Sequence, residues 1–177
     1  MPRIGFFSKK GGSAKSTLAL LFFSFMKRSG FNVTIDDKDP QGTLGASIEA
    51  LGWELDGDPD YTLVDYPSKH DVTGDVKKLD LVIVPTGISF PDLHALKQTL
   101  EALTAKGIDK SMIRIVPCKI RHGATHEDGL ARIKKLKYKT TAPLPLRMEI
   151  ENFVDRGGKL SPAVRETINQ IIIKAVG

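Results

Sequence analysis

Residues 9–17 read Lys9-Lys10-Gly11-Gly12-Ser13-Ala14-Lys15-Ser16-Thr17, between an apolar segment at 3–8 and an apolar-rich helical pattern at 16–28. Glycines allow successive backbone N–H groups to curl around an anion, because they have no Cβ to clash. The N-terminus of the following helix adds a partial positive charge. The order of these three segments therefore predicts a phosphate-binding loop between a buried strand and a helix.

This loop predicts which residues bind a nucleotide. Lys15 would reach the β- and γ-phosphates, and the hydroxyl of Ser16 would bind Mg²⁺. The other residues predicted to bind the nucleotide are Gly11, Gly12, Ser13, Ala14 and Thr17. The standard pattern is GxxxxGK[ST], so Ala14 stands where a glycine is usual. A glycine-rich turn with a solvated lysine is the alternative, and the strand and helix on either side disfavour it.

A second lysine, Lys10, precedes Lys15 by five residues. This spacing resembles the deviant Walker-A signature of the ParA/MinD family of partition and positioning ATPases. In that family the early lysine crosses a dimer interface and contacts the partner's nucleotide. The resemblance implies that ATP and Mg²⁺ hold two copies of the chain in a sandwich homodimer, and it makes Lys10 and Lys15 catalytic residues. Lys10 as ordinary surface charge is the alternative.

An acidic segment, Asp37-Lys38-Asp39-Pro40-Gln41-Gly42, follows the second predicted strand. It resembles the D-x-D-P-Q-G switch segment of the family. The resemblance implies that Asp39 orients or activates the attacking water and is the third catalytic residue, while Asp37 lies near the Mg²⁺ waters. Read alone, the segment is a turn, since Asp-Pro and Gln-Gly are turn dipeptides.

Leu63-Val64-Asp65-Tyr66-Pro67 resembles the Walker-B strand end of the same family. Asp65 would hold Mg²⁺ through water, because Mg²⁺ keeps much of its hydration shell. The usual Asp-Thr-Pro-Pro is altered at Tyr66 and Ser68.

Two later segments correspond to the places where relatives contact the nucleotide base. The resemblance implies contacts from Pro117 and Cys118, which follow the fifth predicted strand, and from Arg147 in a late Pro-Arg segment. In the family the base is adenine. We expect Cys118 to be a small buried apolar residue rather than a reactive thiol.

The rest of the chain predicts an α/β fold. Apolar runs at 3–8, 32–37, 61–65, 79–85 and 113–117 lack polar alternation, as is typical of parallel strands buried on both faces. Three helices are expected after a Ser89/Asp92 capping box, a Thr125/Asp128 capping box and a Ser161-Pro162 start, and 52–60 is expected to be a loop. We therefore expect a doubly wound, mostly parallel sheet flanked by helices on both faces, in one domain over 1–177.

Composition excludes several classes of protein. The chain has 177 residues, 41% hydrophobic and 27% charged, which is ordinary for a globular domain. A single cysteine excludes a disulfide framework and cysteine-built zinc or iron–sulfur sites within one chain. The four histidines show no metal-ligand spacing.

The longest strongly apolar run, 18–23, is far shorter than a bilayer requires, and the N-terminus does not resemble a secretory signal. We expect a cytoplasmic protein with no membrane partner.

The net charge of +5 is unevenly distributed. Ten basic and three acidic residues lie between 106 and 139, so this segment carries +7 and the rest of the chain −2. The residues predicted to bind DNA are Arg132, Lys134, Lys135, Lys137 and Lys139. Neutralising several phosphates would give nonspecific, salt-sensitive binding to double-stranded DNA. A solvated helix face is the alternative.

These patterns and the resemblance together predict a small ParA-like ATPase. It would bind nonspecific DNA as an ATP-bound dimer, associate with the nucleoid, and segregate a plasmid or chromosome with a centromere-binding adaptor protein. Because the chain is short for the family, we expect no N-terminal DNA-binding extension and no operator-specific repression. One alternative is an ATPase that positions a protein cargo or a cell-division component. A metabolic ATP-dependent ligase or kinase on the same fold is a less favoured one.

Overall fold

The computed structural model describes residues 1–68, 74–120 and 124–177. Its centre is a six-stranded sheet in the order β2-β3-β1-β4-β5-β6, in which every pair is parallel. The strands are β1 (Arg3–Phe6), β2 (Val33–Asp37), β3 (Tyr61–Asp65), β4 (Leu81–Thr86), β5 (Ile113–Pro117) and β6 (Lys139–Thr140). Parallel strands end at the same edge of the sheet. The phosphate-binding loop and the two acidic segments, residues 37–42 and 63–67, therefore meet at that edge.

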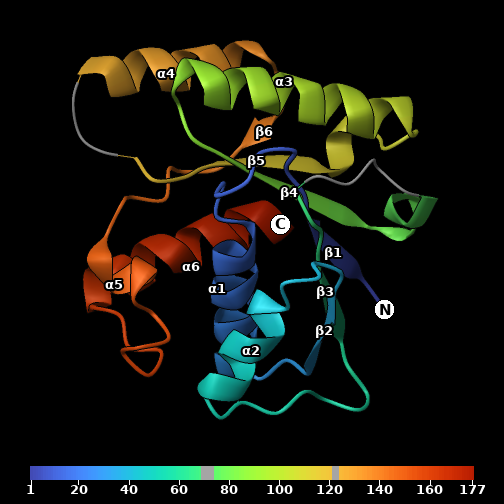
Figure 1. Cartoon of the computed structure of the whole chain (residues 1–177), viewed down its shortest axis with the longest axis vertical. Helices are drawn as coiled ribbons and strands as arrows, with labels where there is room; N and C mark the ends of the chain where they lie inside the picture. Colours follow the sequence, from blue (N-terminus) through green and yellow to red (C-terminus); the bar gives the residue numbers. More distant parts are fainter. Residues whose placement is uncertain (69–73, 121–123) are drawn as a thin grey trace.

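Helices cover both faces of the sheet (Figure 1), as a doubly wound fold requires. The α-helices are α1 (Lys15–Arg28), α2 (Thr43–Ala50), α3 (Phe90–Ala105), α4 (Ala124–Lys135), α5 (Met148–Glu151) and α6 (Pro162–Val176). Two 3-10 turns, η1 (Gly74–Lys78) and η2 (Lys110–Met112), precede β4 and β5. Helices α1, α2 and α6 lie on one face, and α3 and α4 on the other. The predicted fold class is confirmed.

The two faces of the sheet bury separate apolar layers. Along β4, Ile83 packs with α1 and α6, while its neighbours Val82 and Val84 pack with α3 and α4. Successive side chains of a strand point to opposite faces, so a strand buried on both sides must be apolar throughout. This is why the central strands show no polar alternation in the sequence.

Most predicted segments are present in the structure, and several differ in their bounds or their helix caps. β3 and β5 have the predicted bounds, whereas β1 ends at Phe6, two residues early. The Ser89/Asp92 capping box is confirmed. The helix expected after the Thr125/Asp128 box is present as α4, which begins at Ala124, one residue before Thr125. Ser161 precedes α6 but makes no capping hydrogen bond, and its hydroxyl donates to Glu149 instead. Helix α2 and strand β6 were not predicted.

No helix in these three described ranges combines the length and the hydropathy needed to span a membrane.

The core prediction concerns Phe22. Its side chain is fully buried, and its ring packs edge-on against Phe6 with centroids 5.1 Å apart. Phe22→Ala is expected to lower the free energy of unfolding by about 3 to 5 kcal/mol, because a cavity adds to the lost apolar transfer energy. Urea denaturation measures this. Phe90→Ala is the control, because Phe90 is 77% exposed and its loss should change stability by about 0.5 kcal/mol or less. Equal losses for both variants would contradict the packing described.

Candidate functional site

The phosphate-binding loop joins β1 to α1 and has the backbone shape its glycines predicted. Gly12 has φ 68°, and Ala14, at the N-cap of α1, has φ 75° and ψ 27°. Ala14 therefore adopts the left-handed conformation that the usual glycine adopts more readily, at a cost of about 1 kcal/mol. The carbonyl of Ala14 accepts the first hydrogen bond of the helix, from the N–H of Leu18 at 2.9 Å. The alanine thus keeps the loop conformation of the standard motif.

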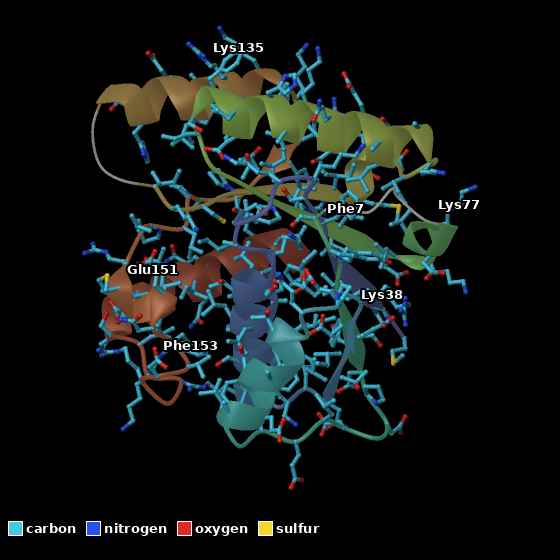
Figure 2. All side chains as sticks on the ribbon, in the orientation of Figure 1. Phe7, Lys38, Lys77, Lys135, Glu151 and Phe153 are labelled. Carbon is cyan, nitrogen blue, oxygen red and sulfur yellow. The ribbon has the colours of Figure 1, made fainter. Side chains whose placement is uncertain are left out.

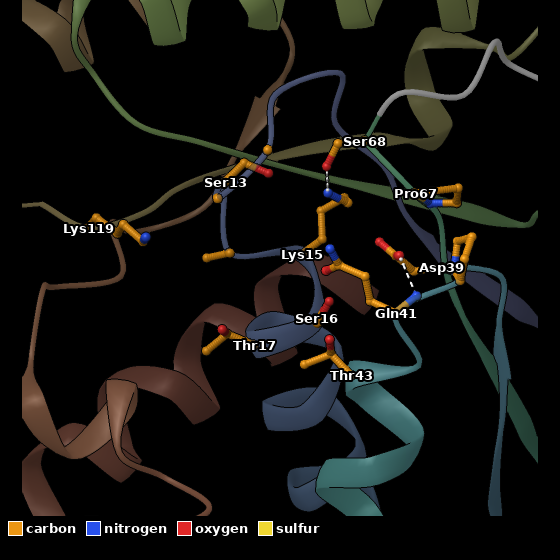
Figure 3. A pocket seen from close by; sticks show the side chains of 14 residues that line it. Ser13, Lys15, Ser16, Thr17, Asp39, Gln41, Thr43, Pro67, Ser68 and Lys119 are labelled. Carbon is orange, nitrogen blue, oxygen red and sulfur yellow. Dashed lines mark hydrogen bonds between the residues drawn. The ribbon is translucent and has the colours of Figure 1, made fainter.

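Lys15 is buried, although it carries an ammonium group. Its Nζ donates a hydrogen bond to the hydroxyl of Ser68 at 2.5 Å (Figure 3). Burial lowers the pKa of the Lys15 ammonium, while the nearby Asp65 and Asp39 act in the opposite direction. Ser68 is one of the two departures from the Walker-B pattern, and it serves here as the acceptor for the loop lysine. Sequence reasoning did not find this contact, because it joins two loops.

Asp65, at the end of β3, is fully buried beneath the loop. Its Oδ2 accepts a hydrogen bond from the hydroxyl of Ser16 at 2.5 Å, whereas Oδ1 has no partner within the described part of the chain. Burial raises the pKa of Asp65 to about 6, although the hydrogen bond from Ser16 and the charge of Lys15 oppose this rise. The Oγ of Ser13 is likewise buried and unpartnered among the described residues.

A hydroxyl and a free carboxylate oxygen side by side fit Mg²⁺, which prefers oxygen ligands. Within the described ranges, no three His, Cys, Asp or Glu side chains gather closely enough to enclose a metal. This agrees with the usual mode of Mg²⁺ binding, in which one or two carboxylates act together with substrate phosphates and water. Ser16 and Asp65 are the residues that the structure brings together for such an ion.

The two aspartates of the first acidic segment have different positions. Asp37 accepts hydrogen bonds from the backbone N–H of Asp39 and of Gly45, each at 3.1 Å, so both of its oxygens hold the turn into α2. Asp39 lines the cavity described below, and Asp37 does not. Lys38 contacts Asp36 and Asp75 instead, at 3.4 and 3.1 Å, and so ties this segment to η1.

The loop borders a cavity of about 790 Å³ (Figure 3), within the size range of ligand sites. Besides Asp39 and all the loop residues from Gly11 to Thr17, its walls include side chains that were not predicted to bind a ligand. These are Pro40, Gln41, Thr43, Pro67, Ser68 and Lys119. The predicted residues and these additions come from four separate segments, which meet only in the folded chain.

A second cavity of about 210 Å³ adjoins the first and shares Ala14, Thr17 and Lys119 with it. Arg147 lines this second cavity, as do Leu144, Pro145, Leu146, Ile150 and Glu151. Arg147 therefore lies beside the cavity of the phosphate-binding loop, and its contact with a nucleotide base stays a prediction.

Pro117 and Cys118 line neither cavity, so the structure does not bring these two predicted base contacts to the site. Cys118 is 1% exposed, and its Sγ lies 3.3 Å from the carbonyl of Val116. Burial raises the pKa of the Cys118 thiol to about 12, in line with the expected inert, buried residue. The chain turns at Lys119, which has φ 58°, and Lys119 lines both cavities in their place.

Lys10 does not line the cavity. Its ammonium forms an ion pair with Asp92, in the first turn of α3. The side chain of Lys10 remains 39% exposed. The two lysines of the loop therefore have different surroundings: Lys15 is inside the site and Lys10 is beside it.

The predicted DNA-binding residues form an exposed basic surface at the end of α4 and along β6. Its members are Arg132, Lys134, Lys135, Lys137 and Lys139, and we call it the α4 basic surface. Ile133, between them, is fully buried, so the helix presents one apolar and one basic face. Figure 2 shows Lys135 on the outer side of α4. Among the described residues, none of these five side chains pairs with a carboxylate.

His94 is exposed and contacts Gln98, while His70 and His122 lie outside the described residues. Tyr66, the other departure from the Walker-B pattern, packs its ring against Phe7 at 5.8 Å.

The buried carboxylate generates a stability prediction. The pKa of Asp65 is raised in the folded chain, so ionising this carboxyl group destabilises the fold. This destabilisation is absent below about pH 4, grows as the pH rises, and reaches its full size above about pH 6. Asp65→Asn, in protein purified without nucleotide, is expected to gain about 2 to 3 kcal/mol at pH 7, since one pKa unit corresponds to about 1.4 kcal/mol. Urea unfolding from pH 4 to 7 measures the difference between variant and parent. A difference that is zero at pH 7, or that does not shrink toward pH 4, would contradict the prediction.

Comparison with known proteins agrees with this geometry. Residues 4–160 match the family model for the CobQ/CobB/MinD/ParA nucleotide binding domain. No curated protein sequence matches the chain significantly.

Solved structures share the whole fold at low sequence identity. A plasmid partition protein from Borrelia burgdorferi B31, bound to AMPPNP, is 14% identical, with a TM-score of 0.79 over 99% of this chain and 98% of that one. Apo McdA from Cyanthece is 15% identical, with a TM-score of 0.78 over all of both chains. MinD in the Aquifex aeolicus MinC:MinD complex is 16% identical, with a TM-score of 0.76 over 99% and 94% of the two chains.

The family model covers most of the chain and includes the loop, both acidic segments and the residues around the second cavity. The resemblance to ParA and MinD proteins is confirmed, and the chain belongs to the CobQ/CobB/MinD/ParA family of nucleotide-binding domains.

Proposed function

We propose that this chain is a ParA-like ATPase that binds ATP with Mg²⁺, pairs with a second copy in that state, and segregates plasmid or chromosomal DNA with a centromere-binding adaptor protein. The observation that carries the proposal is the different placement of the two loop lysines. Lys15 lines the large cavity, whereas Lys10 lies outside it. Lys10 would therefore contact a nucleotide on another molecule, once its side chain leaves the ion pair with Asp92. The AMPPNP bound to the Borrelia plasmid partition protein supports ATP as the ligand.

Within one chain, the loop N–H groups and the Lys15 ammonium would bind the phosphates. Such charge-assisted hydrogen bonds are roughly twice as strong as neutral ones. When bound, Mg²⁺ would neutralise charge on the phosphate oxygens. Ser16 and the free oxygen of Asp65 are the groups that would hold it.

Asp39 would orient the attacking water, because it lines the cavity and its carboxylate is fixed by the N–H of Gln41 at 3.1 Å. Asp37 would act on the Mg²⁺ waters only if the turn that it holds were to rearrange. One carboxylate that positions one water is a limited catalytic apparatus. Hydrolysis by the chain alone would therefore be slow, and a partner protein would accelerate it.

The nucleotide would control pairing through its differential contacts. ATP would favour the dimer because the second molecule's Lys10 would contact its γ-phosphate, and hydrolysis would remove that contact. The cycle would then return to single chains. Arg147 and Lys119 would contact the adenine end of the nucleotide from the second cavity.

The α4 basic surface would bind the DNA. Its five exposed cations have no carboxylate partner in the described ranges, so nothing on the described surface neutralises them. Binding would be independent of base sequence, because the phosphate backbone supplies the attraction. Association with the nucleoid would follow from this binding.

A second candidate is an ATPase that positions a protein cargo or a cell-division component. It is favoured by the similar TM-scores of McdA and MinD, because the fold alone does not separate them from the plasmid partition protein. This candidate shares the nucleotide-driven dimer and lacks the DNA role. A metabolic ligase or kinase would share neither feature.

The dimer prediction uses light scattering with ADP, ATP and a nonhydrolysable analogue. The parent chain is expected to double its mass with ATP or the analogue and to stay single with ADP. Lys15→Ala is expected to weaken nucleotide binding by roughly 10- to 100-fold, because it removes a charged hydrogen bond.

Lys10→Ala is the matched variant, since it removes a lysine of the same loop that lies outside the cavity. Its dissociation constant for ATP should be within about threefold of the parent chain's, because exposed charges contribute little to binding energy. With ATP it should remain a single chain. A Lys10→Ala variant with full ATP turnover would favour the ligase or kinase instead.

The DNA prediction uses fluorescence anisotropy with a random duplex at several salt concentrations and with ATP present. Replacing Lys134, Lys135 and Lys137 by glutamine should lower the log–log salt slope by about 2 to 3, since each lost phosphate contact removes about 0.9. Lys77, Lys159 and Lys174, changed together, are the control, because they are equally exposed and lie elsewhere. If both triple variants lower the salt slope equally, the net charge of the chain alone explains its DNA binding. That result would favour the protein-cargo candidate.

A further inference from the structure

We propose that Asp92 is the counter-ion that retains Lys10 on its own chain, and that two chains pair only when the triphosphate of one displaces Asp92 from the Lys10 of the other. This inference rests on the proposed function and adds a restraint that controls the same site. It gives Asp92 the part of a positioning residue, which acts through Lys10 and touches no nucleotide.

Asp92 is held rigidly. It lies in the first turn of α3, where its carboxylate accepts from the N–H of Ser89 at 3.1 Å and from the Ser89 hydroxyl at 2.5 Å. The chain passes so close at Gly87 that a Cβ there would lie 2.2 Å from the Asp92 carboxylate. The side chain of Asp92 is only 18% exposed. The capping box and the neighbouring glycine therefore fix the acceptor, whichever way Lys10 points.

Lys10 is the movable partner. Its backbone is anchored, because its N–H donates to the hydroxyl of Ser8 at 3.3 Å and the N–H of Lys9 donates to the buried Thr99 of α3 at 3.1 Å. The long side chain, 39% exposed, has only the ion pair with Asp92 to hold it among the described residues. Release therefore needs a rotation of one side chain, on the picosecond to nanosecond scale, and no movement of the loop.

Charge explains why a nucleotide can compete. Asp92 offers one negative charge that is already shared with two donors from Ser89. A triphosphate offers several negative charges, and attraction grows with charge. The ion pair therefore opposes pairing weakly, by an amount that a nucleoside triphosphate can overcome. The Lys10–Asp92 ion pair therefore disfavours the pairing of chains that carry no triphosphate.

The experiment compares dimer dissociation constants by sedimentation equilibrium with a nonhydrolysable ATP analogue. Asp92→Asn keeps an oxygen that can accept from the Ser89 N–H, so the cap of α3 is preserved while the charge is lost. A partly exposed ion pair is worth roughly two- to fivefold. Because each dimer breaks two such pairs, the dissociation constant is expected to fall by roughly 4- to 25-fold.

Two controls isolate the ion pair. Ser89→Ala weakens the helix cap and keeps both charges, so its dimer should be within about twofold of the parent chain's, by the modest worth of a cap. Lys10→Ala with Asp92→Asn should behave like Lys10→Ala alone, because the aspartate acts only through the lysine. Circular dichroism checks that each variant is folded.

The outcomes separate this inference from the proposed function. If the parent chain pairs with the analogue and Asp92→Asn pairs equally or less well, Asp92 is no restraint and the inference is overturned while the proposed function stands. If the parent chain stays single with the analogue, the proposed function fails and the inference fails with it. Tighter pairing in Asp92→Asn, lost when Lys10 is also removed, supports both.

Discussion

The structure depends on one buried contact, between the hydroxyl of Ser16 and the carboxylate of Asp65. It joins the start of α1 to the end of β3 and so fixes the phosphate-binding loop above the sheet. A carboxylate without exposed surface is costly to ionise, which is why the pKa of Asp65 is raised to about 6. Among the described residues, Asp65 is the one carboxylate with a buried oxygen that lacks a partner, and this is the oxygen that we propose for Mg²⁺.

The ionic groups around this contact share one arrangement, in which each is held by a neighbour that a ligand could replace. Lys15 donates to the hydroxyl of Ser68, and Lys10 pairs with Asp92. A neutral hydroxyl and a single carboxylate are weaker partners for an ammonium group than a triphosphate is. We therefore expect nucleotide binding to replace these side-chain partners with phosphate oxygens.

Local signals explain which parts of this arrangement could be predicted. The loop, β3, β5 and the Ser89/Asp92 capping box follow from apolar runs and from contacts within a few residues. Helix α2 was missed because it is only eight residues long, has the left-handed Gly42 as its N-cap and contains Gly45. Strand β6 has two residues and exists because β5 offers an edge to pair with. Neither has a periodic pattern long enough to recognise.

The sequence alone determined the α/β class and the phosphate-binding loop with Lys15 and Ser16, because apolar runs and glycine spacing are local properties. Asp39 and Asp65 became candidates through the resemblance of their segments to the ParA/MinD family. Only the tertiary structure decided that Lys119 replaces Pro117 and Cys118 at the cavities, that Ser68 accepts from Lys15, and that Asp92 holds Lys10. These contacts join residues far apart along the chain, up to 82 positions for Lys10 and Asp92. Their partners are set by how strand order and helix packing bring loops to one edge of the sheet, which no short stretch of sequence encodes.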